Sequence, residues 1–254
     1  MMAFNDVMTD KSANDVVSEF AREKICAIVK DPVVAETLCP KTYPIGGKRL
    51  CIDNRYYDMY NRDNVTLVDV AAAPIVAFTE NGLRTTEAEY PLDIIIMATG
   101  FDAVTGAMAR IRIEGVDGIT MAEKWAEGPT TYLGVMTAGF PNLLMVHAPQ
   151  TPGAQAQMIT TGEWQVNYIA EIIDALERDG LSRIDTTVEA EQPCADEVAM
   201  VSQFTVHRLA DSWYNARNIE GKKGGFMIYV GGFPRYAELC ETAVKQDHAG
   251  FVRT

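Results

Sequence analysis

The chain has 254 residues, of which 48% are hydrophobic and 22% are charged, as expected for a folded protein of one large or two small domains. Its formal net charge of −13 argues against nucleic acid or an anionic membrane surface as the main partner, because both repel an acidic protein. No apolar run approaches the roughly 18 residues of a membrane-spanning helix, so we expect no membrane span.

The first elements predicted along the chain are two helices and several short strands. Ser12 can cap a helix that ends near Asp31-Pro32, because proline cannot continue it. A second helix is expected at residues 33–38, before a loop at residues 41–49. The dipeptide Asn81-Gly82 predicts a hairpin turn. The strands expected in this part of the chain are residues 67–70, 75–79, 83–89 and 94–97.

The last of these strands is the most informative. Residues 94–97 read Ile-Ile-Ile-Met and are followed by Ala98-Thr99-Gly100-Phe101-Asp102. A short apolar run bounded by turn residues is typical of a central strand covered on both faces. Ligands bind at the carboxyl end of such a strand in an open α/β sheet, and Gly100 permits close backbone approach. We predict a ligand site here, with an ordinary strand and tight loop as the alternative.

The second half of the chain alternates predicted helices with short apolar strands. The helix from residue 157 to 178 carries an apolar face and ends before Gly180. The other helices are expected at residues 121–126, 195–208 and 234–245, and the strands at residues 111–113, 143–146 and 226–230. The sequence therefore predicts a mixed α/β fold.

Cysteine, histidine and glycine positions limit the possible sites. The cysteines lack zinc-site spacing and the first residues resemble no secretory signal, so we expect free thiols and a cytoplasmic protein. The three histidines lie far apart, and we expect no metal site. No two of the 19 glycines are separated by a single residue, so the GxGxxG fingerprint is absent. A chain of this kind would supply only part of a dinucleotide site. The cysteines are Cys26, Cys39, Cys51, Cys194 and Cys240.

An ordered set of motifs nevertheless resembles a known family. The motifs are Lys48-Arg49, residues 61–65, residues 93–102, Gly128-Pro129, residues 139–142, Ser212-Trp213-Tyr214, residues 229–233 and residues 250–252. Together they resemble the carboxyl-terminal half of a type I Baeyer–Villiger monooxygenase of the phenylacetone, steroid or cyclohexanone kind. The likeness covers essentially the whole chain. The half of the family's sequence that carries the glycine-rich fingerprints has no counterpart in it.

The resemblance implies a layout and an activity. Residues 1–46 would be the end of a helical insertion, residues 47–92 the second part of an NADP domain, and residues 99–254 the second part of an FAD domain. The fold would be an incomplete pair of Rossmann-like domains. The whole enzyme would use FAD, NADPH and O₂ to convert a ketone to an ester or lactone. Its missing partner would be an amino-terminal half or a flavoprotein chain.

The resemblance also assigns roles to residues before the middle of the chain. Arg49 matches the catalytic arginine, and a guanidinium suits the anionic oxygen of the reaction because it is always cationic and donates two hydrogen bonds. Lys48 matches a lysine that faces the NADP 2′-phosphate. Thr99, Gly100 and Asp102 match a turn near flavin and cofactor. The alternatives are a solvated loop for the two basic residues and an Asx turn for Asp102.

Further roles fall on a predicted substrate pocket. Met158 matches a methionine that faces flavin and substrate, and Gly153, Ala154 and Gln155 precede it in the loop that shapes the ketone pocket. Methionine is an adaptable pocket wall, although a helix-core position is the alternative. Gln155 is polar where relatives are often apolar, which points to a different substrate.

A last set of roles falls on the segment after Ser212. Trp213 matches a tryptophan whose indole reaches NADP, and Asn218 matches a cofactor-binding residue. Relatives commonly have glycine where Ala216 stands, and often proline at Glu220, which puts the backbone of this loop in doubt. The lysines at 222–223 are expected to be a family feature or simply a solvated turn.

Two other classes of protein fit the same residues. One is a non-catalytic interaction protein that docks on a flavoprotein partner through a large apolar patch. The other is a different flavin monooxygenase, such as an N-hydroxylating enzyme. The pair formed by Lys48-Arg49 and Trp213 argues against the second class, because in the resembled family both serve a retained NADP and an anionic oxygen.

Overall fold

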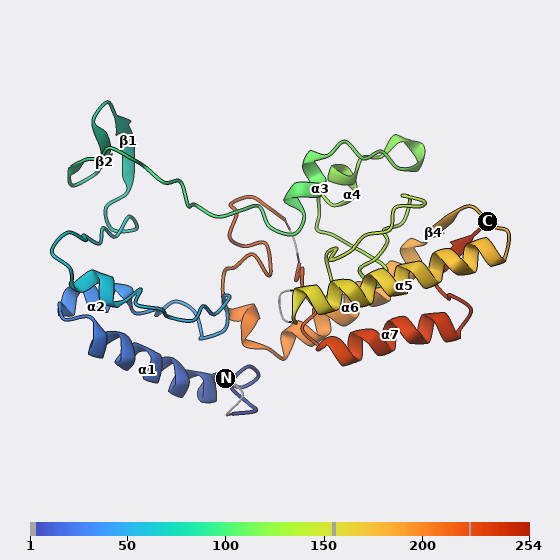
Figure 1. The fold of residues 1–254 in the computed structure, drawn as a ribbon, viewed down its shortest axis with the longest axis horizontal. Coiled ribbons are helices and arrows are strands. Elements are labelled where there is room, and N and C mark those ends of the chain that lie inside the picture. Colours follow the sequence, from blue (N-terminus) through green and yellow to red (C-terminus); the bar gives the residue numbers. More distant parts are fainter. Residues whose placement is uncertain (1–3, 154–155, 224) are drawn as a thin grey trace. The chain divides into compact units, whose positions relative to one another are not determined.

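The structure is a computed structural model that describes residues 4–153, 156–223 and 225–254, and the chain divides into two compact units (Figure 1). Unit 1 comprises the residues up to Val7, Lys11–Ile45 and Arg49–Gly100. Unit 2 comprises Met8–Asp10, Gly46–Lys48 and Phe101–Thr254. The predicted mixture of helix and sheet is confirmed. None of the described helices has the length and apolar character needed to cross a bilayer.

Unit 1 begins with two helices, α1 (Lys11–Ile28) and α2 (Pro32–Leu38). The Asp31 carboxylate caps α2, because it accepts hydrogen bonds from the backbone N–H groups of Val33 at 2.8 Å and Val34 at 3.2 Å. Ile25 packs with Ala35 in a small buried cluster between the two helices. Both predicted helices are therefore confirmed, but Ser12 lies within α1 rather than capping it, and α1 ends at Ile28. The turn η1 (Asp58–Asn61) follows them.

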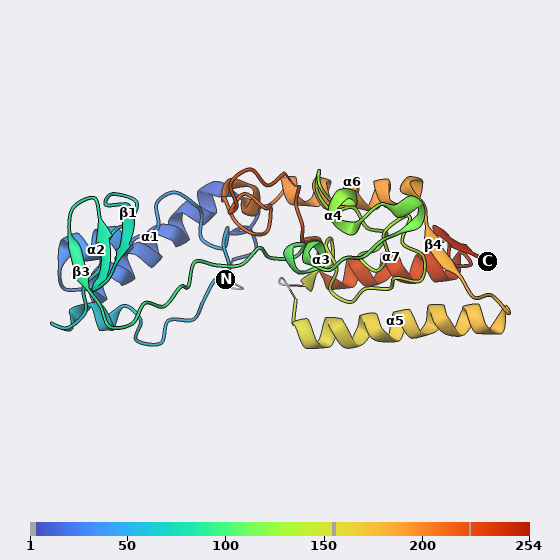
Figure 2. The same ribbon diagram turned by 90° about the horizontal axis from the view of Figure 1, so that it is seen from above.

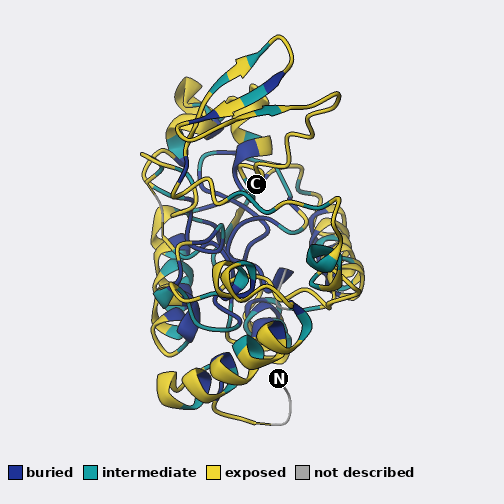
Figure 3. Ribbon diagram, turned by 90° about the vertical axis from the view of Figure 1, so that its left-hand side faces the viewer, coloured by how far each residue is buried: buried dark blue, intermediate teal, exposed yellow. Residues whose placement is uncertain are grey.

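A three-stranded antiparallel sheet completes unit 1. Its strands are β1 (Ile75–Thr79), β2 (Gly82–Thr85) and β3 (Glu89–Pro91), coloured mainly as exposed or intermediate in Figure 3. Thr79 pairs with Gly82, so the hairpin loop is residues 80–81 and lies one residue before the predicted Asn81-Gly82 turn. The predicted strand at residues 83–89 is split by a turn, and residues 67–70 form no strand.

The predicted buried strand at residues 94–97 is wrong in this structure. We call these four residues the apolar segment. The structure assigns them no strand, and all four side chains are exposed, with exposed fractions of 79% for Ile94 and 84% for Ile96. Phe101, just beyond the segment, is 87% exposed. A central strand becomes buried only when neighbouring strands and helices cover it, and the described residues provide no such cover.

Among its described residues, unit 2 contains long helices, which Figure 2 shows, and two short strands. Its helices and turns are α3 (Gly106–Arg110), η2 (Val116–Gly118), α4 (Met121–Lys124), α5 (Met158–Arg178), α6 (Val188–Gln203), η4 (Val206–Leu209) and α7 (Phe233–Lys245). Strands β4 (Ile184–Thr186) and β5 (Phe251–Arg253) pair antiparallel. Helices α5 and α7 lie side by side in both views.

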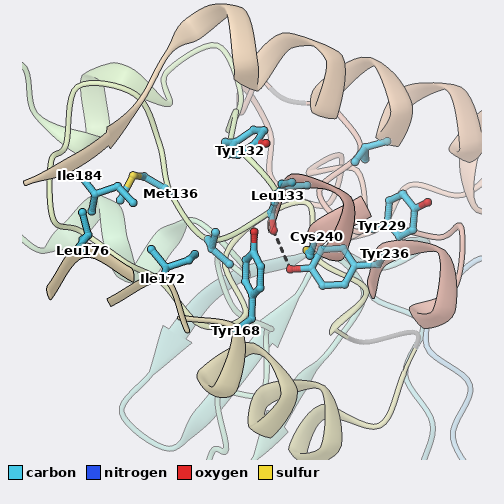
Figure 4. Packing of buried hydrophobic residues seen from close by; sticks show 13 residues of the cluster. Tyr132, Leu133, Met136, Tyr168, Ile172, Leu176, Ile184, Tyr229, Tyr236 and Cys240 are labelled. Atoms are coloured by element: carbon cyan, nitrogen blue, oxygen red, sulfur yellow. Dashed lines mark hydrogen bonds between the residues drawn. The ribbon is translucent and has the colours of Figure 1, made fainter. Parts of the chain in front are cut away.

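The core of unit 2 lies between these helices and the loop at residues 132–136 (Figure 4). Ile172 of α5 and Cys240 of α7 are fully buried in it. The Tyr236 hydroxyl donates a hydrogen bond to the Leu133 carbonyl at 2.7 Å, and Gln165 donates one to the Tyr236 hydroxyl at 2.8 Å. These bonds satisfy polar groups that would otherwise be costly to bury.

Several sequence predictions for unit 2 need correction. The predicted strands at residues 111–113, 143–146 and 226–230 form no strands, while β4 and β5 were not predicted. Helix α6 begins at Val188 rather than residue 195. The Thr187 hydroxyl caps it by accepting from the Ala190 N–H at 3.2 Å, and the helix continues through Pro193.

Candidate functional site

The sequence-predicted site residues are divided between the two units. Unit 1 contains Arg49, Thr99 and Gly100. Arg49 and Thr99 are exposed, and so is Lys48, which belongs to unit 2. The remaining described members, all in unit 2, are Asp102, Gly153, Met158, Trp213 and Asn218. Ala154 and Gln155 lie outside the described residues.

Asp102 is held by a basic partner from a distant part of the chain. Its carboxylate forms an ion pair with the Lys222 ammonium, whose side chain is 20% exposed. Gly106, at the start of α3, makes room for Asp102, since a Cβ there would lie 2.4 Å from the carboxylate carbon. The interpretation of Lys222 as a simple solvated lysine is therefore wrong. The sequence did not reveal this partner, because it lies 120 residues further along the chain.

The neighbouring Lys223 makes a second contact to another loop. Its ammonium lies 2.8 Å from a carboxylate oxygen of Glu127, and both side chains are well exposed. An exposed pair of this kind stabilises by about 0–1 kcal/mol. Together the two lysines attach the segment after Trp213 to the turn at Asp102 and to the loop that carries Gly128-Pro129.

The loop around Trp213 is built on buried polar groups. The Asn215 amide donates to the Ala210 carbonyl at 2.8 Å, and its oxygen accepts from the Ser212 N–H at 3.2 Å. Trp213 is half-buried, and its ring centroid lies 4.3 Å from that of Tyr214. The indole is thus fixed by a hydrogen-bonded turn and by an aromatic neighbour, whereas Asn218 is exposed.

Ala216 stands where the family resemblance leads us to expect a glycine, and its backbone has a conformation that favours glycine. Its φ is +61°, in the left-handed region that L side chains rarely adopt, and the residue is buried. The steric conflict costs roughly 1–2 kcal/mol in a non-glycine residue. The loop therefore keeps a glycine-type turn with an alanine in it.

Met158 and Gly153 are brought together at the start of α5. Met158 is the first residue of the helix and 46% exposed, so it is not a helix-core residue. A Cβ on Gly153 would lie 3.6 Å from the Met158 sulfur, which shows that the thioether rests against that glycine. Two of the four predicted pocket residues are therefore neighbours.

His147 is a residue near this loop that the sequence did not single out. Its backbone N–H donates to the Gln165 side-chain oxygen at 3.0 Å, and its φ is +55°. Within the described part of the chain, its Nδ1 is buried without a hydrogen-bond partner. Gly162 faces the ring, because a Cβ there would lie 2.8 Å from Nε2. The only sequence signal was a lone histidine after an apolar run.

His207 lies beneath the Trp213 loop. Its ring centroid is 5.3 Å from that of Tyr214, and the residue is 4% exposed. Burial lowers the pKa of His207 below its ordinary value, because the charged imidazolium is poorly solvated there. The support of Trp213 thus includes an imidazole that is neutral near pH 7.

Comparison with known proteins finds relatives that match almost the whole of this chain. No family model matches the chain. A Baeyer–Villiger monooxygenase of Pseudooceanicola batsensis is 40% identical over 251 residues, which are 98% of this chain and 45% of the relative. The chain is homologous to part of the Baeyer–Villiger monooxygenases. It spans about half the length of the curated relatives it matches, which confirms the resemblance to the family's carboxyl-terminal half.

Other relatives extend this result. Cyclopentanone 1,2-monooxygenase of Comamonas sp. is 38% identical over 98% of this chain and 46% of its own length. Phenazine N-monooxygenase of Lysobacter antibioticus is 36% identical, with the same two coverages. The crystal structure of OTEMO in complex with FAD and NADP matches 99% of this chain and 46% of its own, with a TM-score of 0.94 and 37% identity. The homologues are thus flavin monooxygenases of more than one substrate type.

Proposed function

We propose that the chain is the carboxyl-terminal portion of a flavin-dependent Baeyer–Villiger monooxygenase. The whole enzyme inserts one oxygen atom of O₂ next to a ketone carbonyl, giving an ester or lactone, and uses NADPH. The observation that carries this proposal is the match to OTEMO over 99% of this chain, in a structure that contains FAD and NADP. In this assignment residues 1–46 end a helical insertion, residues 47–92 belong to the NADP domain, and residues 99–254 belong to the FAD domain.

The residues of this chain fit part of a dinucleotide site. Gly106 gives the Asp102 carboxylate a place against the first turn of α3, in the turn that the resemblance assigns to the neighbourhood of the cofactors. The chain has no pair of glycines separated by one residue, so a phosphate-binding loop has to come from other polypeptide. FAD, when bound, would supply the oxygen-activating redox chemistry. The residues described here would hold and orient it and NADP.

The resemblance assigns roles to the basic and aromatic residues, and their chemistry suits those roles. Arg49 would hold a positive charge and paired hydrogen-bond donors where anionic oxygen develops in the reaction. Lys48 would meet the NADP 2′-phosphate, and the Trp213 indole N–H would donate to the same cofactor. Thr99, Gly100 and Asn218 would contact the cofactors, and the residues assigned to the ketone pocket are Gly153, Ala154, Gln155 and Met158.

The exposed apolar segment supports the proposal that this chain is only one part of the enzyme. Four consecutive apolar side chains at residues 94–97 are exposed to water, and burial of each large one would contribute about 1.5–3 kcal/mol. The relatives contain as much polypeptide again as this chain covers. We assign the cover of the segment to that half, in the same chain or in a partner, which makes the isolated chain inactive. A cytoplasmic location stays a prediction.

Co-expression tests this proposal. We expect this chain and the amino-terminal half of cyclopentanone 1,2-monooxygenase to give a yellow FAD complex that oxidises NADPH when cyclopentanone is added. Arg49→Ala should abolish product while FAD stays bound, and Arg49→Lys is the matched control that retains charge but loses the paired hydrogen bonds. Lactone formation by the isolated chain would refute incompleteness. An Arg49→Ala complex with full activity would favour the alternative that this chain is a non-catalytic protein that docks on a flavoprotein partner.

N-oxygenation is a second candidate function. The match to phenazine N-monooxygenase covers 98% of this chain at 36% identity, close to the value for cyclopentanone 1,2-monooxygenase. The same complex should therefore be offered phenazine and cyclopentanone in parallel. An N-oxide without lactone would replace the ketone assignment, and lactone without N-oxide would retain it.

A further inference from the structure

Two cysteines of unit 1 lie close enough to react with each other. Cys26 is on α1 and Cys39 directly follows α2, and their sulfur atoms are 3.8 Å apart. A disulfide bond is about 2.0 Å long, so the two sulfur atoms have to approach each other by less than about 2 Å, which rotation about the Cα–Cβ bonds can provide. The sequence suggested only scattered free thiols, because the contact forms when α2 folds back on α1.

The surroundings of the two sulfurs differ. Cys26 is exposed, so an oxidant reaches it from solvent. Cys39 is 7% exposed and packs with Ile25 and Ala35, and its thiol donates to the Arg22 carbonyl at 3.8 Å. Burial and the contact with Cys26 raise the pKa of Cys39 to about 11. The exposed thiol is therefore the one that attacks, and the buried thiol is held in place to resolve.

We infer that Cys26 and Cys39 form a dithiol pair that hydrogen peroxide oxidises reversibly to a disulfide. The Cys26 thiolate attacks one peroxide oxygen, the O–O bond breaks, and the departing hydroxide takes up a proton to leave water and a sulfenic acid. The Cys39 thiol then attacks the Cys26 sulfur. It loses its proton, the S–O bond breaks, and a second water leaves. Two thiols are oxidised by two electrons, and one peroxide is reduced to two waters.

The consequence of the bond is a covalent link between α1 and α2. It would join the two helices across the small cluster that already packs them, and close a short loop of the chain. Closing a loop restricts the unfolded state, so the oxidised chain should unfold at a higher temperature than the reduced chain. A thiol reductant should reverse the difference.

Peptide mapping of the full chain tests the inference. The chain is treated with stoichiometric hydrogen peroxide, remaining thiols are alkylated, and trypsin is added without reductant. Cleavage after Lys24, Lys30 and Lys41 separates the two cysteines. We expect a cross-linked species of residues 25–30 and 31–41, lost on reduction. Separate peptides with over-oxidised Cys26, or Cys26 joined to Cys51, would overturn the inference.

Variants sharpen this experiment. Cys51→Ser removes another exposed thiol and should leave the cross-link unchanged. Cys39→Ser should leave Cys26 to accumulate sulfinic acid, because no thiol resolves the sulfenic acid. The peptide map of the unsubstituted chain shows by itself whether Cys26 and Cys39 become cross-linked, so the inference stays testable even if Cys39→Ser folds poorly. A cross-linked chain that unfolds at a lower temperature than the reduced chain would show that the two helices do not accommodate the bond.

Discussion

The apolar segment of unit 1 and the aromatic-rich core of unit 2 have similar apolar character but opposite exposure. Ile96 is 84% exposed, whereas Ile172 is fully buried. Unit 2 surrounds its apolar residues with α5, α6, α7 and the loop at residues 132–136, all from one stretch of the chain. Unit 1 brings nothing of the kind to residues 94–97. Apolar sequence therefore indicates a need for cover, and the cover can come from outside the segment's own unit.

The strongest test of the self-contained core is removal of its buried charge. The Glu191 carboxylate accepts from the Thr137 hydroxyl and the Ala138 N–H, both at 2.7 Å, and lies 3.0 Å from the Lys124 ammonium. Glu191→Ala should lower the free energy of unfolding by about 3–5 kcal/mol, because Lys124 is left partly buried and unpaired. Urea unfolding measures this. Glu127→Ala, which breaks the exposed pair with Lys223, should cost about 0–1 kcal/mol.

Two isoleucine substitutions test the contrast directly. Ile172→Ala should lower the free energy of unfolding by about 2–5 kcal/mol, because it leaves a cavity in the core. Ile96→Ala should change it by less than about 0.5 kcal/mol in the isolated chain. Urea unfolding of both variants provides the measurement. Equal losses would mean that the apolar segment is already covered in solution, which would contradict the exposed arrangement.

The buried histidine gives the core a pH dependence. The pKa of His207 is lowered in the folded state, so the unfolded state binds more protons as pH falls. Stability should therefore be full above the ordinary histidine pKa of about 6.5 and decrease as pH falls below it. Urea unfolding midpoints measured between about pH 7.5 and about pH 5, a range that spans this pKa, give the dependence of stability on pH. His207→Gln should flatten it, whereas an unchanged slope would assign the effect to other groups.

The smallest expected effect concerns the strained turn. Ala216→Gly should raise the free energy of unfolding by roughly 0.5 kcal/mol, because relief of about 1–2 kcal/mol of strain is partly offset by the greater freedom of glycine in the unfolded chain. Ala210 is equally buried but has an ordinary φ of −119°. Ala210→Gly should instead lower stability by roughly 0.5–1 kcal/mol. Thermal unfolding of the pair distinguishes strain from the loss of a methyl group.

The fold was predictable where its causes are local. The caps and prolines around α2 and the apolar face of α5 lie within a few residues, and both helices were predicted. Strands were less predictable, because β4 and β5 depend on pairing between residues 184 and 253. The strand predicted at residues 94–97 fits the apolar pattern but depends on cover from other polypeptide.

The candidate site was predictable only in part. Local sequence pointed to the turn at Asp102, whereas Trp213 and Met158 were identified through the family resemblance. The structure places all three at the ends or turns of elements. The sequence did not identify Lys222 as the partner of Asp102 or the proximity of Cys26 to Cys39, since both depend on how the chain folds back. The roles of Arg49 and Lys48 stay predictions that the co-expression experiment addresses.

The hydrogen bonds of Gln165 have an evolutionary consequence. One side chain of α5 accepts from the backbone of His147 and donates to Tyr236 of α7, which in turn donates to Leu133. The start of the loop at residues 147–153 is thereby anchored by atoms that do not belong to the loop itself. The rest of that loop, residues 148–153, is itself buried, so its packing depends on the two helices that hold it. A substitution in α5 or α7 would therefore be felt in the loop, and the three segments are expected to change together in evolution.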